Sequence, residues 1–111
     1  MKDPCVYILA SARNGTLYIG VASDIYGRMA EHKQGLIEGV SNRYATKMLV
    51  YDEMHLTMEG AIIREKQLKE WKRVWKIRLI ESMNPEWCDL FNEATGVLRE
   101  GLADRARIGR N

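Results

Sequence analysis

The chain has few cysteines and no long apolar run, and each shortage excludes a class of protein. Only two cysteines, Cys5 and Cys88, occur among 111 residues, too few for a disulfide framework and without the paired spacing of a zinc site. We expect both thiols to be reduced and packed. No apolar run approaches the roughly 20 residues that cross a bilayer, and Asp3 and Pro4 stand where a signal peptide would be apolar. The sequence therefore predicts a soluble, cytoplasmic protein.

Net charge is also small, but it is unevenly distributed. The formal charge is only +2, and hydrophobic residues make up 46% and charged residues 29% of the chain, values typical of one globular domain. Between Arg64 and Arg78, seven basic residues stand against two acidic ones, so the rest of the chain is net negative. Such a segment is typical of a contact with nucleic-acid phosphates, and equally of a solvated helix face. Composition leaves both interpretations open.

Alternating strand and helix patterns predict an α/β (α+β) domain with a small sheet flanked by helices. Asn14-Gly15 lies between two segments rich in β-branched and aromatic residues, which predicts a hairpin. The first helix begins at Ser23 or Asp24 and reaches about Leu36 before glycines interrupt it. The predicted strands are 6–10, 16–21 and 47–53, and the predicted helices are 24–36, 57–70 and 74–83.

The last part of the sequence predicts the limits of the domain. Asn84-Pro85 ends the third helix, and Trp87, Leu90 and Phe91 are expected to close the core. Apolar periodicity is lost from about Ala94, so we predict a domain over 1–92 and a flexible C-terminal tail over 93–111. The tail is a candidate for binding a protein partner, and the sequence leaves the oligomeric state open.

Two tyrosines of the predicted hairpin are expected to share a face of the sheet. With a two-residue loop, Tyr18 opposes Ser11, which lies on the same face as Tyr7 because side chains alternate with period two. With a four-residue loop over 11–14, Tyr7 and Tyr18 are directly opposite. Tyrosine is also a good strand former with an amphipathic tip, so a purely structural role stays open for the pair.

Three polar residues on the predicted helices are further candidates for a site. Arg28 and His32 are four residues apart and share one helix face, as exposed residues or as part of a site. Glu65 falls between Ile62 and Leu68 on the stripe expected to face the sheet, where a carboxylate is rarely buried unless it is paired or binds a metal. A buried ion pair and a divalent-cation ligand are the two interpretations of Glu65.

Taken together, these residues resemble the GIY-YIG nuclease family. The resemblance extends from about Cys5 to Trp87, keeps the order and spacing of five elements, and is closest to a small single-domain bacterial subgroup that is compared with the nuclease domain of the repair excinuclease. In chain order the elements are Cys5-Val6-Tyr7, Tyr18-Ile19-Gly20, Arg28 with His32, residues 61–69 around Glu65, and residues 84–87 beginning with Asn84.

Two positions depart from the family pattern. Cys5 stands where the first motif has glycine, and Val21 stands where some relatives have lysine. The missing lysine argues against a mechanism that needs an ammonium group at that position. It leaves the core of tyrosine, arginine and glutamate intact.

The resemblance implies hydrolysis of phosphodiester bonds in DNA with one divalent cofactor ion, Mg²⁺ or Mn²⁺. Glu65 would be the sole protein ligand, with waters and substrate oxygens completing the octahedron. Tyr7 would act as general base for the attacking water, with Tyr18 and His32 orienting that water or tuning Tyr7. The planar guanidinium of Arg28 would bind the transition-state phosphate.

The resemblance also gives roles to the asparagine and to the basic segment. Asn84 would support the site by hydrogen bonding near Glu65, although an asparagine before proline also ends a helix. Basic side chains on the second and third helices would hold the duplex through phosphate contacts, which position DNA without reading its sequence. The predicted DNA-binding residues are Lys66, Lys69, Lys72, Arg73 and Lys76.

The function that follows is a metal-dependent DNA endonuclease, selective for branched or flapped structures and acting in DNA repair or recombination. The alternative is an accessory nucleic-acid-binding module with the same fold that cuts slowly or not at all, which the modest net charge and the missing lysine favour. Trp71 and Trp75 are four residues apart and are expected in the core, with base stacking as the other interpretation.

Overall fold

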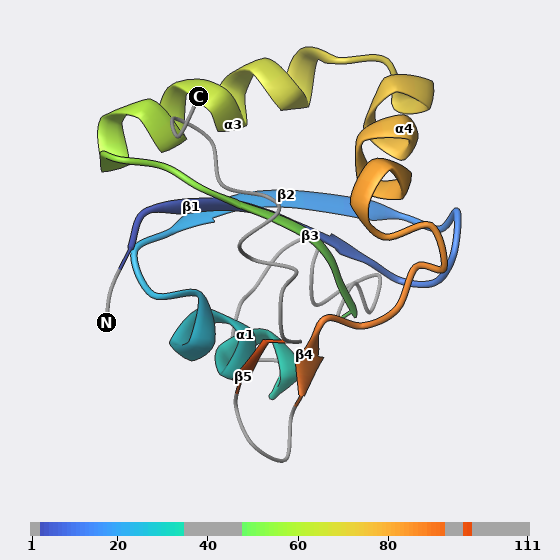
Figure 1. Ribbon diagram of the computed structural model, residues 1–111, viewed down its shortest axis with the longest axis horizontal. Coiled ribbons are helices and arrows are strands. Elements are labelled where there is room, and N and C mark those ends of the chain that lie inside the picture. Colours follow the sequence, from blue (N-terminus) through green and yellow to red (C-terminus); the bar gives the residue numbers. More distant parts are fainter. Residues whose placement is uncertain (1–2, 35–47, 93–96, 99–111) are drawn as a thin grey trace.

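The computed structural model of the protein describes residues 3–34, 48–92 and 97–98. Figure 1 shows a three-stranded antiparallel sheet with α3 and α4 on one face and α1 on the other, beside a separate two-stranded ladder. This arrangement confirms the predicted α/β architecture. The elements are β1 (Cys5–Ala10), β2 (Leu17–Ala22), α1 (Ile25–Lys33), β3 (Met48–Met54), α3 (Met58–Glu70), α4 (Arg73–Met83), β4 (Phe91–Asn92) and β5 (Val97–Leu98).

The hairpin of β1 and β2 forms at the predicted place with a register of its own. Tyr7 pairs with Gly20, and the loop covers residues 12–15, unlike either loop considered from the sequence. The Ser11 N–H donates to the Thr16 carbonyl, and the Ser11 hydroxyl accepts from the Thr16 N–H, each at 3.0 Å. Asn14 supplies the left-handed residue of the turn, with φ of 60°. The side chain of Ser11 therefore closes a four-residue loop in which Ser11 is paired with Thr16.

The helices begin at the predicted caps. The Asp24 carboxylate accepts from the Gly27 N–H at 3.3 Å, and the Thr57 hydroxyl accepts from the Gly60 N–H at 3.0 Å. α3 ends at Glu70 and α4 at Met83, as predicted. The first helix ends earlier, at Lys33, and the predicted extension to Leu36 lies outside the described residues.

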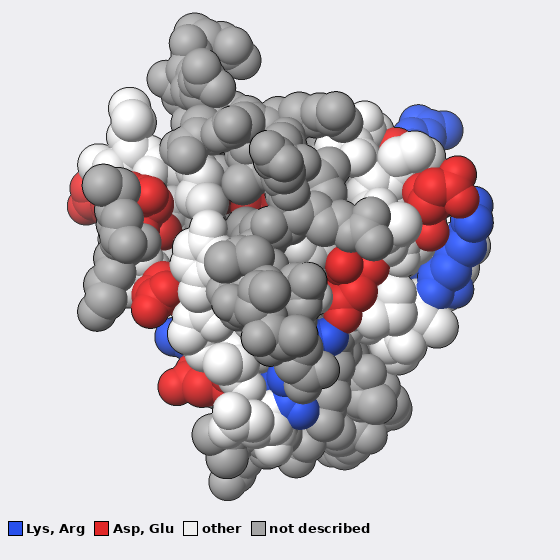
Figure 2. Space-filling model, turned by 60° about the horizontal axis from the view of Figure 1, so that its bottom comes forward, with Lys and Arg blue, Asp and Glu red and all other residues white. Residues whose placement is uncertain are grey.

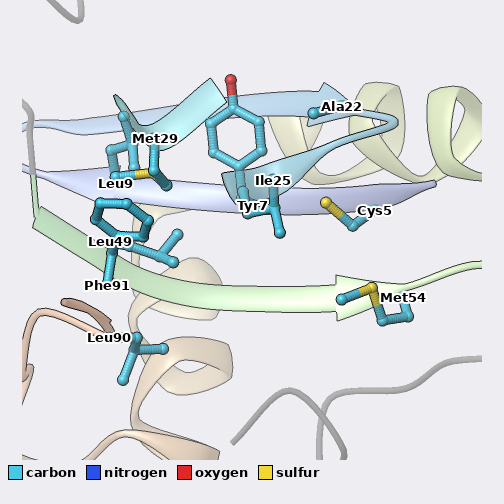
Figure 3. Close-up of a cluster of buried hydrophobic side chains, with 10 residues drawn as sticks. All are labelled: Cys5, Tyr7, Leu9, Ala22, Ile25, Met29, Leu49, Met54, Leu90 and Phe91. Carbon is cyan, nitrogen blue, oxygen red and sulfur yellow. The ribbon is translucent and has the colours of Figure 1, made fainter. Parts of the chain in front are cut away.

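Strand β1 is the centre of the fold and is buried on both faces. The sheet order is β2-β1-β3, so β1 has a hydrogen-bonded neighbour on each side, and all six of its residues are buried. Cys5, Tyr7 and Leu9 face α1, while Val6 and Ile8 face the side of α3 and α4. Figure 3 shows the α1-side cluster, in which the Tyr7 hydroxyl points away from the other labelled side chains. The polar end of Tyr7 thus reaches the margin of the apolar core.

The segment after α4 closes the core, as predicted. Trp87, Leu90 and Phe91 are 2%, 1% and 6% exposed, and the Leu90 N–H donates to the Leu49 carbonyl of β3 at 2.7 Å. Val97 and Leu98 pair with β4, so this part of the predicted tail belongs to a short ladder. The rest of the tail lies outside the described residues. No helix in the described segments is long and apolar enough to span a membrane.

Candidate active site

Three aromatic rings meet where β1, β2 and α1 come together. The Tyr7 hydroxyl lies 3.1 Å from Nε2 of His32, and the ring centroids of Tyr7 and Tyr18 are 6.4 Å apart. The Tyr18 and His32 centroids are separated by 5.4 Å. The prediction that both tyrosines share a face is confirmed, because Tyr18 pairs with Leu9, which lies two residues from Tyr7 on β1. The hairpin and α1 thus bring together residues far apart in the sequence.

A missing side chain makes room for the Tyr7 ring. Tyr7 is opposite Gly20 in the sheet, and a Cβ atom at position 20 would lie 2.5 Å from the Tyr7 hydroxyl oxygen. Any larger residue at position 20 would therefore displace the ring from His32. The Tyr18-Ile19-Gly20 motif therefore needs glycine at its third position because the Tyr7 ring packs directly against the backbone there.

Burial and charge act on Tyr7 in opposite directions. Burial raises the pKa of the Tyr7 phenol, as does the nearby Tyr18, while the positive charge of Arg28 lowers it, and burial prevails. Arg28 extends from α1 with its side chain 39% exposed, and its Nε lies 3.5 Å from a carboxylate oxygen of Glu31. The guanidinium is therefore both close enough to act on the phenol and open to a ligand.

His32 is held in its neutral form. Its side chain is only 1% exposed, and burial, assisted by the positive charge of Arg28, lowers the pKa of His32 from 6.5 to about 4. At neutral pH one ring nitrogen thus carries no proton, and Nε2 accepts from the Tyr7 hydroxyl when Nδ1 carries the hydrogen.

The lowered pKa of His32 predicts a specific loss of stability in acid. The folded protein binds this proton less readily than the unfolded chain, so the contribution of neutral His32 is complete above pH 6.5 and is lost as the pH falls towards 4. A shift of this size corresponds to about 3 kcal/mol. Urea unfolding between pH 4 and 7.5 should show a shallower pH dependence for His32→Gln than for wild type. Parallel profiles would contradict this role of His32.

Glu65 lies in the middle of α3 and is half-buried. Its side chain is 15% exposed, and Oε2 lies 3.3 Å from Nζ of Lys69, one helical turn further on. The expected placement on the stripe between Ile62 and Leu68 is correct for Leu68, which is fully buried, and wrong for Ile62, which is 36% exposed. Ala61 and Leu68 form the buried face instead. Glu65 therefore lies at the border between the core and the surface.

A small pocket lies at the edge strand β2, next to α3 and α4. It has a volume of about 260 Å³ and is lined by residues 17–19 of β2 together with Lys69 and Lys76. Tyr18 is therefore shared by the pocket and the ring cluster, and Lys69 is shared by the pocket and Glu65. The Tyr18 ring packs with the α1-side cluster, whereas Leu17 and Ile19 belong to the cluster on the side of α3 and α4.

A buried charged cluster between β3 and α3 was not expected from the sequence. The Glu53 side chain is fully buried, and its Oε2 lies 2.9 Å from Nε of Arg64 and 2.8 Å from Nε2 of His55. The Tyr51 hydroxyl donates to Oε1 at 2.6 Å. Arg64 directly precedes Glu65, so this cluster anchors the helix turn that carries Glu65. The sequence does contain one indication of this cluster, because Asp52 and Glu53 are two consecutive acidic residues in an otherwise apolar strand.

The predicted DNA-binding side chains have different surroundings. The Arg73 guanidinium donates to the carbonyls of Asn14 and Gly15, at 2.7 and 2.6 Å, so it holds the hairpin loop against α4. Lys66 and Lys72 are exposed, and Nζ of Lys72 lies 5.8 Å from the ring centre of Trp75. The charge prediction did not anticipate the structural role of Arg73.

The surface beneath the sheet does not present a continuous basic patch among the residues that Figure 2 colours. Acidic groups are scattered across this face, and basic groups are most prominent at one edge. α3 and α4, which carry most of the basic segment, lie on the opposite side of the sheet (Figure 1).

Asn84 has a structural role, its support of the site near Glu65 remains a prediction, and the expectation for Trp75 needs correction. The Nδ2 group of Asn84 donates to the carbonyls of Val50 and Cys88, at 2.9 and 3.0 Å. Val50 is the extra residue of a bulge in β3, so Asn84 locks this bulge to the turn that follows α4. Trp75 is not a core residue, since 45% of it is exposed.

Comparisons with known proteins agree with the geometry. Residues 3–78 match the family model described as the GIY-YIG catalytic domain. UPF0213 proteins of Staphylococcus aureus strains Mu3, Mu50 and N315 are each 36% identical over 81 residues, which cover 73% of this chain and 98% of the relative. No solved structure gives a significant match.

Proposed function

Because the chain belongs to the GIY-YIG family, a nuclease family whose catalytic-domain model covers residues 3–78, we propose that it is a divalent-metal-dependent DNA endonuclease. The preferred substrates in this proposal are flapped or branched DNA, and the setting is DNA repair or recombination. The names of the UPF0213 relatives specify neither substrate nor pathway.

One observation carries the proposal above all others. Tyr7, Tyr18 and His32 form a ring cluster beside the charge of Arg28, and α3 carries the partly exposed carboxylate of Glu65. Hydrolysis of a phosphodiester needs an oriented water, positive charge for the equatorial oxygens and a carboxylate for a metal. The cluster and Glu65 together offer a chemical group for each requirement.

The residues present fit a magnesium or manganese ion. Glu65 provides a carboxylate that is 15% exposed at the edge of the helix, and its present partner Lys69 is 53% exposed and free to move. Mg²⁺ is often held by one or two carboxylates, with waters and substrate phosphates as the other ligands. When bound, the ion would supply electrophilic stabilisation of the phosphate oxygens. Glu65 is the residue that would hold it.

The protein's own groups suggest how the proton of the attacking water is removed. Tyr7 is a poor base on its own because burial raises the pKa of its phenol. Its hydroxyl lies 3.1 Å from the neutral imidazole of His32, which orients the phenol, and the positive charge of Arg28 favours the phenolate that would accept the proton of the water. Arg28 meanwhile binds the phosphate oxygens that gain negative charge.

The alternative function is an accessory module that binds nucleic acid without cutting it. The raised pKa of Tyr7 and the valine at position 21 favour this alternative. However, the side chain of Val21 packs on the α3 side of the sheet, away from the ring cluster. A lysine at this position of β2 would therefore project from the opposite face to Tyr7, and its absence weighs little against catalysis.

The proposal is tested with labelled linear, flapped and four-way-junction DNA incubated with purified protein and Mg²⁺. We expect cleavage of at least one structure, with flapped or branched DNA cut faster than linear duplex. Equal cleavage rates on all three DNA structures would contradict the proposed selectivity for flapped or branched DNA. Binding of DNA with no cleavage in Mg²⁺ or Mn²⁺ would support the accessory module instead.

A further inference from the structure

The pocket between β2, α3 and α4 has a distinctive chemical composition. Leu17 and Ile19 contribute apolar walls, and Lys69 and Lys76 contribute ammonium groups. β2 is an edge strand of the sheet, and three of its consecutive residues line the pocket, which therefore runs along the strand. A site with two cations and apolar walls suits an anion attached to a partly apolar group.

The two lysines are placed next to each other by the bend between α3 and α4. Nζ of Lys76 lies 3.5 Å from the backbone carbonyl of Lys69, and Nζ of Lys69 lies 3.3 Å from Glu65. One carboxylate therefore accompanies two ammonium groups, which leaves a net positive charge at the pocket. Lys69 is 53% exposed, so its ammonium can turn from Glu65 to a second anion at little cost.

We infer that this pocket binds a phosphate group of the DNA strand, next to the phosphate that is cut. Lys69 and Lys76 contact the phosphate oxygens, and Leu17 and Ile19 pack against the attached deoxyribose. The inference rests on the proposed nuclease function and deepens it, because it separates these two lysines from the rest of the basic segment. Arg73 is occupied with the hairpin loop, and Lys72 lies over Trp75.

Two of the residues that line the pocket are neighbours of groups that would act on the scissile phosphate. Tyr18 belongs to the ring cluster, and Lys69 belongs to the pair with Glu65. A phosphate bound there would align the strand across Tyr18 and towards Glu65. The pocket would thus set the register of the strand rather than only raise its affinity.

The test uses thymidine 3′,5′-bisphosphate as a small probe, without metal, and follows backbone amide signals by NMR. We expect saturable shifts at Leu17, Tyr18 and Ile19. Lys76→Ala should weaken binding at least about fivefold, whereas Arg78→Ala, which removes the same charge from an exposed position of the same helix, should leave it unchanged. Thymidine without phosphate should give no such shifts. Equal shifts with thymidine, shifts elsewhere, or unchanged binding by Lys76→Ala would overturn the inference.

A parallel measurement on duplex DNA separates this inference from the proposed function. Without metal no strand is cut, so DNA affinity is measured alone across a range of salt concentrations. We expect the salt slope of Lys69→Gln and of Lys76→Ala to fall by about 1 each, and an unchanged slope would contradict the phosphate contact. If the pocket binds phosphate but no DNA is cut when metal is added, the nuclease proposal fails and the pocket stands. If DNA is cut while probe binding and the salt slopes of both lysine variants are unchanged, the pocket inference fails and the nuclease proposal stands.

Discussion

Glu65→Gln should reduce the single-turnover rate of DNA cleavage by about 10³-fold or more while DNA affinity is retained. A divalent ion at a phosphoryl group is worth several kcal/mol of transition-state stabilisation, and each tenfold in rate corresponds to about 1.4 kcal/mol. Glutamine keeps the size of the side chain and removes the charge that would hold the ion. The fold should persist, because the Glu65–Lys69 pair is a one-turn helix pair with an exposed lysine, typically worth less than about 0.5 kcal/mol.

The matched control for Glu65 is Glu59→Gln on the same helix. Glu59 is exposed in the first turn of α3, so its replacement removes one charge without touching the pocket. We expect its cleavage rate to equal that of wild type. DNA affinity of Glu65→Gln should be equal to wild type or slightly higher, because Lys69 is no longer neutralised. A rate within tenfold of wild type would exclude Glu65 as the metal ligand.

Arg64→Ala should lower the free energy of unfolding by about 3 kcal/mol, the largest stability effect that we expect from a single charged residue. The change leaves the fully buried carboxylate of Glu53 without its guanidinium, and breaking a buried ion pair typically costs about 3 to 5 kcal/mol. The hydroxyl of Tyr51 and the imidazole of His55 remain as partners, which places the effect at the lower end. The stacking of Arg64 on Trp71, at 5.2 Å from the ring centre, is also lost.

Urea unfolding measures this effect, with Lys66→Ala as the control. Lys66 is two residues away on α3 and exposed, so its loss should change stability by no more than about 0.5 kcal/mol. The double variant Glu53→Gln with Arg64→Met should be more stable than Arg64→Ala, because it removes both charges and keeps the volume. If Arg64→Ala and Lys66→Ala are equally stable, the buried cluster does not anchor α3.

The parts of the structure that follow from local periodicity could be predicted from the sequence. Tyr7 and Tyr18 share a face of the sheet for any even loop length, so this prediction was correct although the predicted strand register was wrong. The first helix was expected to begin at Ser23 or Asp24 and the second at Thr57, and the caps are Asp24 and Thr57. The angular spacing of helical residues placed Glu65 on the stripe that faces the sheet, and its side chain is only 15% exposed, although Ile62 of the same stripe is exposed.

The uses of individual charges could not be predicted, because they depend on contacts across long sequence separations. Arg64 and Arg73 belong to the same basic segment as Lys69, yet one neutralises a carboxylate on β3 and the other binds carbonyls of the hairpin loop. The loop register depended on a single hydroxyl, that of Ser11. Local charge identifies a basic region, but only the packed fold shows which cations remain available to a ligand.

The neutral state of His32 is another property that the sequence does not reveal. An arginine four residues earlier indicated a shared helix face, whereas the pKa of about 4 arises from burial under the hairpin. This neutral imidazole gives the Tyr7 hydroxyl a hydrogen-bond acceptor at 3.1 Å. Because its pKa is low, this imidazole is a weak base, and its role at Tyr7 is to orient the hydroxyl.

The most direct test of the central claim is the single-turnover cleavage of labelled flapped DNA by wild-type protein in Mg²⁺, in EDTA, and in EDTA followed by excess Mg²⁺. We predict cleavage in Mg²⁺, none in EDTA, and recovery when the ion is restored, with Glu65→Gln inactive in all three conditions. Undiminished cleavage in EDTA, or cleavage by Glu65→Gln at the wild-type rate, would contradict the claim.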